Sequence, residues 1–257
     1  MALITIGSLR SSAVTTTALL LARRWATERE LLLAELDPAG GTLAAMLGRR
    51  SDPGLQSLAA AARRELGAGA VPAHAQPLGG NRSALLAPAT GEQVRDALSM
   101  LADLEELLRD QRGDVICDCG RLDVASPMLS LFSAGEVAII VVRSDLADLR
   151  LLDASLGRRG LRSGRVVDRL RLVLVGSGPY GAAEVAEELG LPVLGNLPID
   201  AAGVAALVAD EALGGLRARS RLRRAGTALA ESVVELLAPS VAVEGFDPVA
   251  DAEELLR

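Results

Sequence analysis

The sequence predicts an α/β protein built on an open, mostly parallel, doubly wound sheet with helices on both faces. Short apolar runs alternate with helix-type patterns along most of the chain. The runs are continuously apolar, as in strands that are covered on both sides. Half of the 257 residues are hydrophobic but only 2% are aromatic, so Leu, Val, Ile and Ala must build the core. This composition is typical of parallel sheets between helices.

Continuous apolar runs mark the expected strands at 2–7, 30–36, 83–89, 114–120, 136–143, 169–176 and 192–198. Helical patterns mark the expected helices at 15–27, 42–48, 53–66, 91–112, 145–156, 181–190, 201–210 and 219–237. The stretch 67–81 is rich in Gly, Pro and Ala and is expected to be an exposed loop. No change in composition demands a second domain. We expect one domain over 1–237 and an acidic tail at 238–257.

Local signals support several of these assignments. Pro53 stands near the start of its helix, where the missing N–H costs nothing. Gly190 follows the last turn of another helix and fits a left-handed cap. The segment 91–112 reads as one long amphipathic helix because its apolar residues recur at helical spacing: Val94, Leu98, Leu101, Leu104 and Leu108.

Composition narrows the function classes. No apolar run approaches the roughly 18 residues that span a bilayer, and the first residues lack the basic start of a signal peptide, so we expect a cytoplasmic protein. The net charge of −6 does not favour a dedicated nucleic-acid binder. All 27 basic residues are arginines. Neither this chain nor an identical partner can therefore bring a lysine to a phosphate.

Cysteine and histidine add little. Cys117 and Cys119 lie two apart in an apolar run, so both point to one face of a strand and are expected to be buried, reduced thiols. His74 is the single histidine. These three residues do not assemble a metal-ligand set.

Ligands of open parallel sheets bind beyond the carboxyl ends of the strands. Three candidate elements fall there: the loop 7–17, Asp37 after the second strand, and Asp118 at the end of DVICDC. A carboxylate at the tip of a buried strand, beside a loop that opens a helix, suits Mg²⁺ and phosphate together.

At these positions the chain resembles the ParA/MinD family of deviant Walker ATPases, within the P-loop NTPases. GSLRSSAVTTTAL overlays the family's K-G-G-V-G-K-T-T-T-A-L without a gap, DPAGG resembles its second acidic motif, and DVICDCG resembles its Walker B strand. LGLPVLGNLPID resembles the strand and Pro-containing loop that border the adenine. Four motifs in the family's order, spread over residues 1–237, imply its three-layer fold.

The resemblance carries roles onto single residues. Asp37 takes the place of the residue that positions the attacking water, and Thr15 and Asp118 take the places of the Mg²⁺ ligands. Leu9 falls where the family has its signature lysine, and Val14 falls where it has the P-loop lysine. The implied nucleotide-binding positions are Gly7, Arg10, Ser11, Ser12, Ala13, Val14, Thr15, Thr16, Pro198 and Asp200.

The departures from the family pattern bear on function. A phosphate loop needs glycine for close approach and positive φ, yet residues 10–13 contain none. Losing the P-loop lysine removes a charge-assisted contact, on the order of ten- to a hundredfold in affinity. A cation at the transferring phosphoryl contributes about 10³–10⁵ in rate. We therefore expect the binding of ATP and Mg²⁺ to be weak or absent.

Several residues keep two interpretations. Arg10 is either a cation that replaces lysine or a solvated loop residue. Asp118 is either a residual acid or a structural cap, and Asp37 can simply begin the DPAGG turn. The threonines 15–17 can cap their helix. The arginines Arg217, Arg219, Arg221, Arg223 and Arg224 form either a patch for DNA or anionic lipid or a solvated helix face.

Three functions follow. The preferred hypothesis is a degenerate ParA/MinD-like positioning or scaffolding factor with slow or absent hydrolysis, in chromosome partitioning, septum placement, or localisation of a pilus or secretion apparatus. The alternatives are an active ATPase that uses Arg10, and a DNA-binding module that uses the arginines of 217–224. The resemblance also implies a protein partner and a homodimer, which an apolar Leu9 would make independent of nucleotide.

Overall fold

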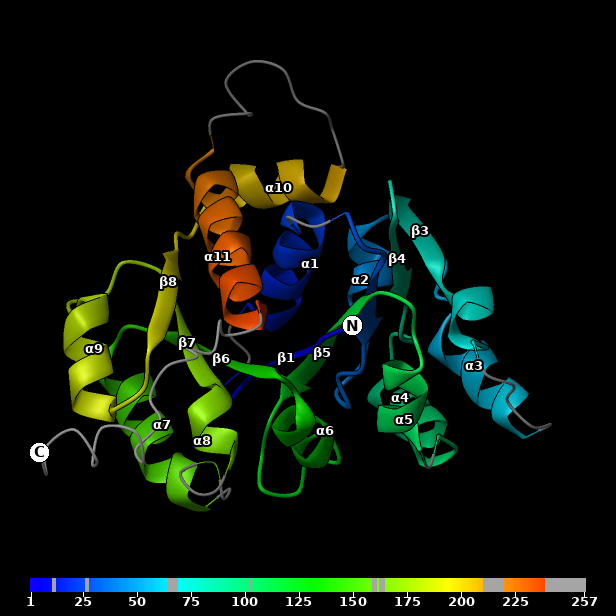
Figure 1. Cartoon of the computed structure of the whole chain (residues 1–257), viewed down its shortest axis with the longest axis horizontal. Coiled ribbons are helices and arrows are strands. Elements are labelled where there is room, and N and C mark those ends of the chain that lie inside the picture. The colour runs from blue at the N-terminus through cyan, green and yellow to red at the C-terminus, as the bar shows by residue number, and fades with distance from the viewer. Residues whose placement is uncertain are drawn as a thin grey trace, which may run out of the picture.

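The computed structural model describes residues 1–10, 13–25, 28–63, 69–101, 103–158, 161, 165–209 and 220–238. Within these residues, eight strands form one sheet in the order β3-β4-β2-β5-β1-β6-β7-β8, with helices on both faces (Figure 1). Neighbouring strands are parallel except for the antiparallel pair β3–β4. The predicted fold class is confirmed.

The strands are β1 (Leu3–Ser8), β2 (Leu31–Glu35), β3 (Gln76–Gly79), β4 (Arg82–Leu85), β5 (Asp114–Arg121), β6 (Val137–Arg143), β7 (Leu170–Val175) and β8 (Val193–Leu197). Alternate residues of a strand enter opposite apolar layers, because successive side chains of a strand point to opposite faces. In β1, Leu3 belongs to one layer, and Ile4 and Ile6 belong to the other. Both faces of the central strand are therefore buried.

The helices that cover one face are α1 (Val14–Arg24), α2 (Leu43–Met46), α10 (Ala201–Ala209) and α11 (Arg221–Leu237). Those that cover the other face are α3 (Leu55–Ala62), α4 (Gly91–Ser99), α5 (Leu104–Arg109), α6 (Leu129–Ala134), α7 (Leu146–Arg158), α8 (Arg165–Arg169) and α9 (Ala182–Leu189). Within the described ranges, no helix combines the length and the apolar character needed to cross a membrane.

The prediction of a loop at 67–81 was wrong for its second half. A 3-10 turn, η1 (Val71–His74), and the edge strand β3 lie there. Gly79 and Gly80 both have positive φ, 98° and 61°, and they turn the chain into β4. Residues 67–68 of the predicted loop and 64–66 of the helix predicted before it lie outside the described residues.

The predicted single helix at 91–112 is two helices, α4 and α5. The N–H groups of Met100 and Leu101 bond three residues back, to Ala97 O and Leu98 O, which tightens and ends the first helix. Asp103 stands at the start of the second helix. The short helices α6 and α8 were not predicted.

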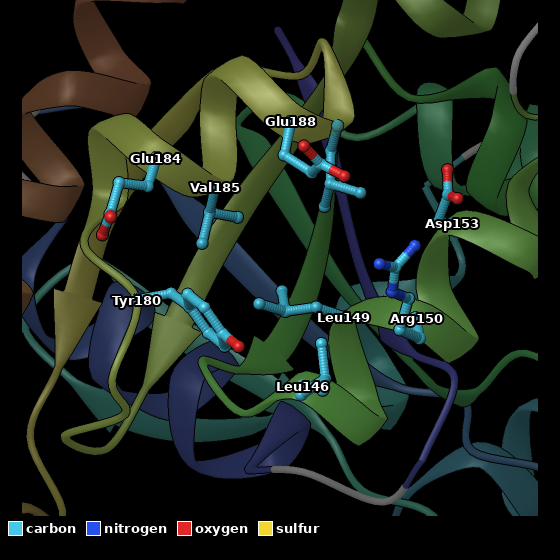
Figure 2. A pocket seen from close by; sticks show the side chains of 9 residues that line it. Leu146, Leu149, Arg150, Asp153, Tyr180, Glu184, Val185 and Glu188 are labelled. Atoms are coloured by element: carbon cyan, nitrogen blue, oxygen red, sulfur yellow. The ribbon is translucent and has the colours of Figure 1, made fainter.

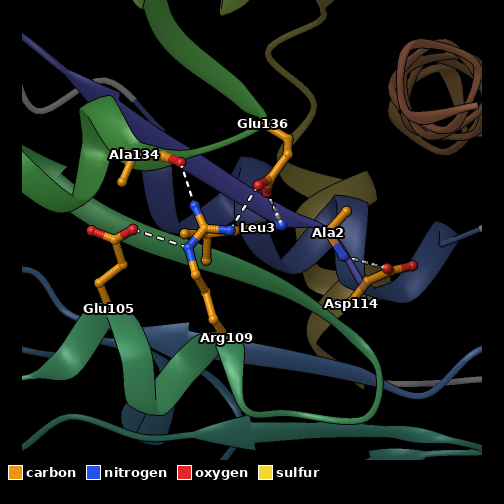
Figure 3. Close-up of polar contacts among 7 residues, drawn as sticks. All are labelled: Ala2, Leu3, Glu105, Arg109, Asp114, Ala134 and Glu136. Atoms are coloured by element: carbon orange, nitrogen blue, oxygen red, sulfur yellow. Dashed lines mark hydrogen bonds and ion pairs between the residues drawn. The ribbon is translucent and has the colours of Figure 1, made fainter. Parts of the chain in front are cut away.

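Two charged networks fasten the amino-terminal edge of the sheet. In the first, the Arg109 guanidinium on α5 bonds Glu105 Oε1 at 2.9 Å, Glu136 Oε1 at 2.7 Å and the Ala134 carbonyl at 2.6 Å (Figure 3). Glu136 Oε2 in turn accepts the Leu3 N–H at 2.6 Å. Burial alone would raise the pKa of Glu136, but these hydrogen bonds, chiefly that from Arg109, lower it. The network ties β1 and β6 to α5.

The second network centres on the buried carboxylate of Asp114, the first residue of β5. Its Oδ1 accepts the Ala2 N–H at 3.0 Å (Figure 3), and its Oδ2 accepts Trp25 Nε1–H at 3.0 Å. Arg29 Nη2 lies 3.1 Å from Oδ2. One side chain thus joins the start of β1, the end of α1 and the entry to β2.

Candidate functional site

The three candidate elements predicted from the sequence lie in one region of the structure. β1 lies between β5 and β6 in the sheet, and β2 pairs with β5 on the other side. Because these strands are parallel, the loop after β1, Asp37 after β2 and Asp118 in β5 all lie at the carboxyl edge. Leu36 N–H bonds the Asp118 carbonyl at 2.8 Å, which places the two acidic segments side by side.

Ala13 keeps a glycine-type backbone in the loop. Its φ of 54° and ψ of 25° are left-handed, and among the described residues it is the one non-glycine with positive φ. This conformation costs about 1–2 kcal/mol for a residue with a Cβ. The Ala13 carbonyl accepts both the N–H and the hydroxyl of Thr17, each at 2.8 Å, which starts α1. The loop therefore keeps a left-handed turn at position 13, although the residue there is alanine and not glycine.

Both positions that the resemblance assigns to lysines are turned into the core. Leu9 is 7% exposed and belongs to the apolar layer on the α7 face. Val14 is 6% exposed and belongs to the opposite layer. Neither side chain is available to a phosphate. Leu9 is buried within its own chain, and its part in a dimer stays a prediction.

Arg10 is engaged within its own chain. Its Nη1 lies 3.5 Å from Asp148 Oδ1, in the first turn of α7, and its side chain is 57% exposed. Asp148 is buried on the sheet side of that helix. An ion pair with one exposed partner contributes about 0–1 kcal/mol. The contact is intermediate between the two interpretations of Arg10: it is neither a free cation nor a purely solvated residue.

Asp118 carries the strongest electrostatic signal of the site. Its side chain is fully buried, Oδ1 accepts the Gly120 N–H at 3.0 Å, and Oδ2 has no hydrogen-bond partner in the described structure. Burial raises the pKa of Asp118 to about 7; the Thr15 hydroxyl lowers it and the nearby Glu35 carboxylate raises it further. An unpartnered buried carboxylate oxygen beside a hydroxyl fits a hard cation such as Mg²⁺.

Asp37 acts as a turn residue. Its Oδ1 accepts the Ala39 N–H at 2.8 Å, and its carbonyl accepts the Gly40 N–H at 3.0 Å. The carboxylate also lies against Gly120, whose φ is 60°; a Cβ there would come within 2.0 Å of Asp37 Cγ. The alternative that Asp37 begins the DPAGG turn is thus present in the structure, and no substrate-facing role is required to explain it.

Sequence reasoning missed Glu35. Its carboxylate is buried and accepts three backbone N–H groups, from Thr42 at 2.6 Å, Leu43 at 2.8 Å and Ala87 at 3.0 Å. Burial raises the pKa of Glu35, although these three bonds lower it. A lone acid inside the apolar run LLLAEL was the available signal. Glu35 holds the acidic turn against β4.

The structure also places several of the other predicted positions. Gly7 is buried in β1, and a Cβ there would come within 2.5 Å of Leu122 Cδ1. Thr16 and Pro198 are half-buried, and Ser11 and Ser12 lie outside the described residues. The threonines do not cap α1, since no side-chain hydrogen bond closes its described N-terminus. Asp200, by contrast, caps the N-terminus of its own helix, α10.

The Asp200 carboxylate accepts the Gly203 N–H and the Ser220 hydroxyl, both at 2.8 Å. The bond from Gly203, followed by that from Ser220, lowers the pKa of Asp200. Of the arginine cluster, Arg221, Arg223 and Arg224 lie in the first turn of α11. Arg217, Arg219 and the tail from 239 onward lie outside the described residues.

A further glycine motif lies between β7 and α9. GSGPYG, 176–181, has G-x-G-x-x-G spacing between β7 and α9, the context of a dinucleotide fingerprint. However, Glu184 Oε2 accepts the Gly181 N–H at 2.7 Å, so a carboxylate of the chain itself occupies the N-terminus of α9. A phosphate would meet like charge there. The segment also carries Tyr180, which lines a groove described below.

Comparison with solved structures assigns the fold. A ParA family ATPase from Chlorobium tepidum superposes with a TM-score of 0.73 at 16% identity, over 90% of this chain and 97% of that one. This chain has the ParA/MinD fold. The septum site-determining protein MinD of Pyrococcus horikoshii, complexed with Mg-ADP, gives 0.67 at 20% identity, over 92% and 97% of the two chains. The MinC:MinD cell division complex of Aquifex aeolicus gives 0.66 at 15%, over 96% and 99%.

No protein-family model matches the sequence. No curated protein matches it significantly either. The ParA/MinD fold is therefore what this chain shares with its structural neighbours. What the carboxyl edge of the sheet can bind has to be argued from the residues of this chain.

Proposed function

We propose that this chain is a scaffolding or positioning factor that has kept the ParA/MinD fold but has lost most of the affinity for ATP. It would act in the cytoplasm, in chromosome partitioning, septum placement, or localisation of a pilus or secretion apparatus. One observation carries the proposal: the two positions where the resemblance places lysines hold Leu9 and Val14, and both side chains are buried in the apolar layers.

Burial makes this loss harder to compensate than a simple change of side chain. Arg10, the cation in the described part of the loop, is paired with Asp148 of its own chain. Reaching a phosphate would require Arg10 to leave a buried carboxylate without its partner. Because the chain has no lysine, no other residue of that type can take over.

A weak residual site is compatible with the remaining residues. Thr15 and the unpartnered Oδ2 of Asp118 would hold Mg²⁺, and the N-terminus of α1 would face the phosphates. Mg²⁺, when bound, would neutralise phosphate charge. The Mg-ADP complex of Pyrococcus horikoshii MinD supports nucleotide binding as a property of this fold, and we propose it here only in weakened form.

We also propose a homodimer that does not need nucleotide, together with a protein partner. Val124 and Ile199 are 64% and 76% exposed, and both lie just beyond the carboxyl ends of their strands, β5 and β8. Exposed apolar side chains at one edge favour association. The Aquifex aeolicus neighbour was solved in complex with MinC, which supports a partner-binding role for the fold.

Phosphate release tests the proposal. The purified chain with ATP and Mg²⁺ should show no turnover above that of its Asp118→Asn variant, because no cation stabilises the transferring phosphoryl. Asp123→Asn, an exposed carboxylate in the turn after β5, is the matched control and should behave as wild type. Steady turnover by the wild type that Asp118→Asn abolishes and Asp123→Asn preserves would show an active ATPase and refute the proposal.

A further inference from the structure

A groove lies between α7 and α9, and none of its lining residues belongs to the loop that follows β1. It has a volume of about 340 Å³ and is open on one side. Its lining divides into an apolar set and a charged set. The apolar residues are Leu146, Leu149, Tyr180, Val185 and Leu189. The charged residues are Arg150, Asp153, Glu184 and Glu188.

Three of the four charged residues lie toward one end of the groove, whereas Glu184 lies on the side of Val185 and Tyr180. Figure 2 shows Leu149 of α7 and Val185 of α9 on the floor near Tyr180, with Leu146 beyond them. Glu188, Asp153 and Arg150 gather toward the other end. Leu146 is 54% exposed, which is unusual for a leucine in the first turn of a helix that packs on the sheet. An apolar floor beside a charged end is the lining expected of a site for an amphipathic segment.

The charge of the lining residues indicates which kind of segment fits the groove. Three carboxylates and one guanidinium line the groove, so its rim is acidic. α9 adds Glu187, and its sequence AAEVAEEL contains no basic residue. An acidic rim repels phosphate-rich nucleic acid and anionic lipid, and it attracts lysine and arginine side chains.

The chain itself is a poor occupant. Residues 239–257 carry five acidic residues and one arginine, the same sign of charge as the rim. A second copy of the chain carries a net charge of −6. Both arguments favour a different protein.

We propose that the α7–α9 groove is the docking site for an amphipathic segment of a partner protein, which places apolar side chains on the Leu146–Tyr180 floor and a lysine or arginine at Glu188. This inference rests on the proposed scaffolding function and adds to it the place and chemistry of partner recognition. Docking through apolar anchors with a charged rim matches the way helices bind in grooves.

The test is a fluorescence-anisotropy titration without nucleotide. The probe is a labelled helical peptide of about 14 leucines and lysines, with leucine at i, i+3, i+4 and i+7. The control peptide has glutamate in place of every lysine. The full-length wild type should bind the lysine peptide saturably, and the glutamate peptide should bind at least about tenfold more weakly.

Two matched pairs of variants locate the site. Glu188→Lys should weaken binding of the lysine peptide about tenfold or more, whereas Glu187→Lys, the same change one residue away outside the lining, should change it less than about threefold. Leu146→Ser should weaken binding about fivefold or more, whereas Leu236→Ser, which changes an exposed leucine of α11 on the other face of the sheet, should not. Circular dichroism confirms that each variant is folded.

Three results would overturn the inference. One is the absence of saturable binding. Another is equal weakening by both charge reversals, which would mean diffuse attraction to an acidic surface. The last is a change in the mass of the chain by light scattering on Glu188→Lys, which would mean that a second copy fills the groove. Because no nucleotide is present, failure here leaves the phosphate-release result standing.

Discussion

Asp118→Asn stabilises the protein at neutral and alkaline pH, by about 3–4 kcal/mol above pH 7. The reason is that burial raises the pKa of Asp118 from its ordinary value of 3.8 to about 7 in the folded chain. The folded state therefore holds this proton more tightly than the unfolded state. The stability that protonation contributes is fully present below about pH 4, and it is lost as the pH rises toward 7, where the carboxylate is left charged and buried.

Urea denaturation followed by circular dichroism between pH 4 and pH 8 checks this. The free energy of unfolding of Asp118→Asn should match that of wild type near pH 4, and the difference should grow up to pH 7 and then stay constant. Asp123→Asn, which alters an exposed carboxylate, should differ from wild type by less than about 0.5 kcal/mol throughout. A difference that does not depend on pH would contradict the electrostatic explanation. A buried, unpartnered carboxylate such as that of Asp118 lowers the stability of the folded chain, which is typical of a position selected for binding and not for stability.

Asp114→Ala should destabilise the protein strongly, by about 2–6 kcal/mol, because two buried donors lose their acceptor at about 1–3 kcal/mol each. It removes the acceptor of the Ala2 N–H and of Trp25 Nε1–H, and it leaves both of these buried donors unsatisfied. It also removes the partner of Arg29. Three segments would lose the side chain that joins them.

Urea denaturation at pH 7 measures this loss. The control is Asp123→Ala, which removes an exposed carboxylate that accepts one N–H, from Ala125 at 2.9 Å, and should cost less than about 1 kcal/mol. Trp25 is the single tryptophan, and its emission reports whether the indole remains buried in the native Asp114→Ala variant. A cost for Asp114→Ala no greater than that for Asp123→Ala would show that the network is redundant.

The fold could be predicted because its signals are local and repeated. Buried parallel strands such as β1 and β6 are uninterrupted apolar runs, and Gly190 marks the end of α9 in the left-handed conformation that was expected, with φ of 63°. The errors arose where local signals conflict. β3 is a four-residue edge strand inside a Gly- and Pro-rich stretch. The periodicity of 91–112 runs on through a break that is visible only in backbone hydrogen bonds.

The site could be located from the sequence but not resolved in detail. Motif order placed the loop after β1 and the acids at Asp37 and Asp118 on one edge. It could not show that Leu9 and Val14 are buried in opposite layers, because that depends on how the loop enters the core. The Arg10–Asp148 pair and the three donors to Glu35 join segments that are distant in the chain, so tertiary packing alone reveals them.

The central claim is that the loop after β1 binds a triphosphate weakly or not at all. Calorimetric titration of the protein with ATP and Mg²⁺ tests this claim most directly. The wild type should bind at least about tenfold more weakly than an Ala13→Gly/Val14→Lys variant, which regains glycine at the left-handed position and a side chain that, unlike valine, is long enough to carry an ammonium group out of the apolar layer. Ala13→Gly alone serves as the folded control for the glycine change. Wild-type binding with a Kd of a few micromolar or tighter, unchanged in the double variant, would contradict the account.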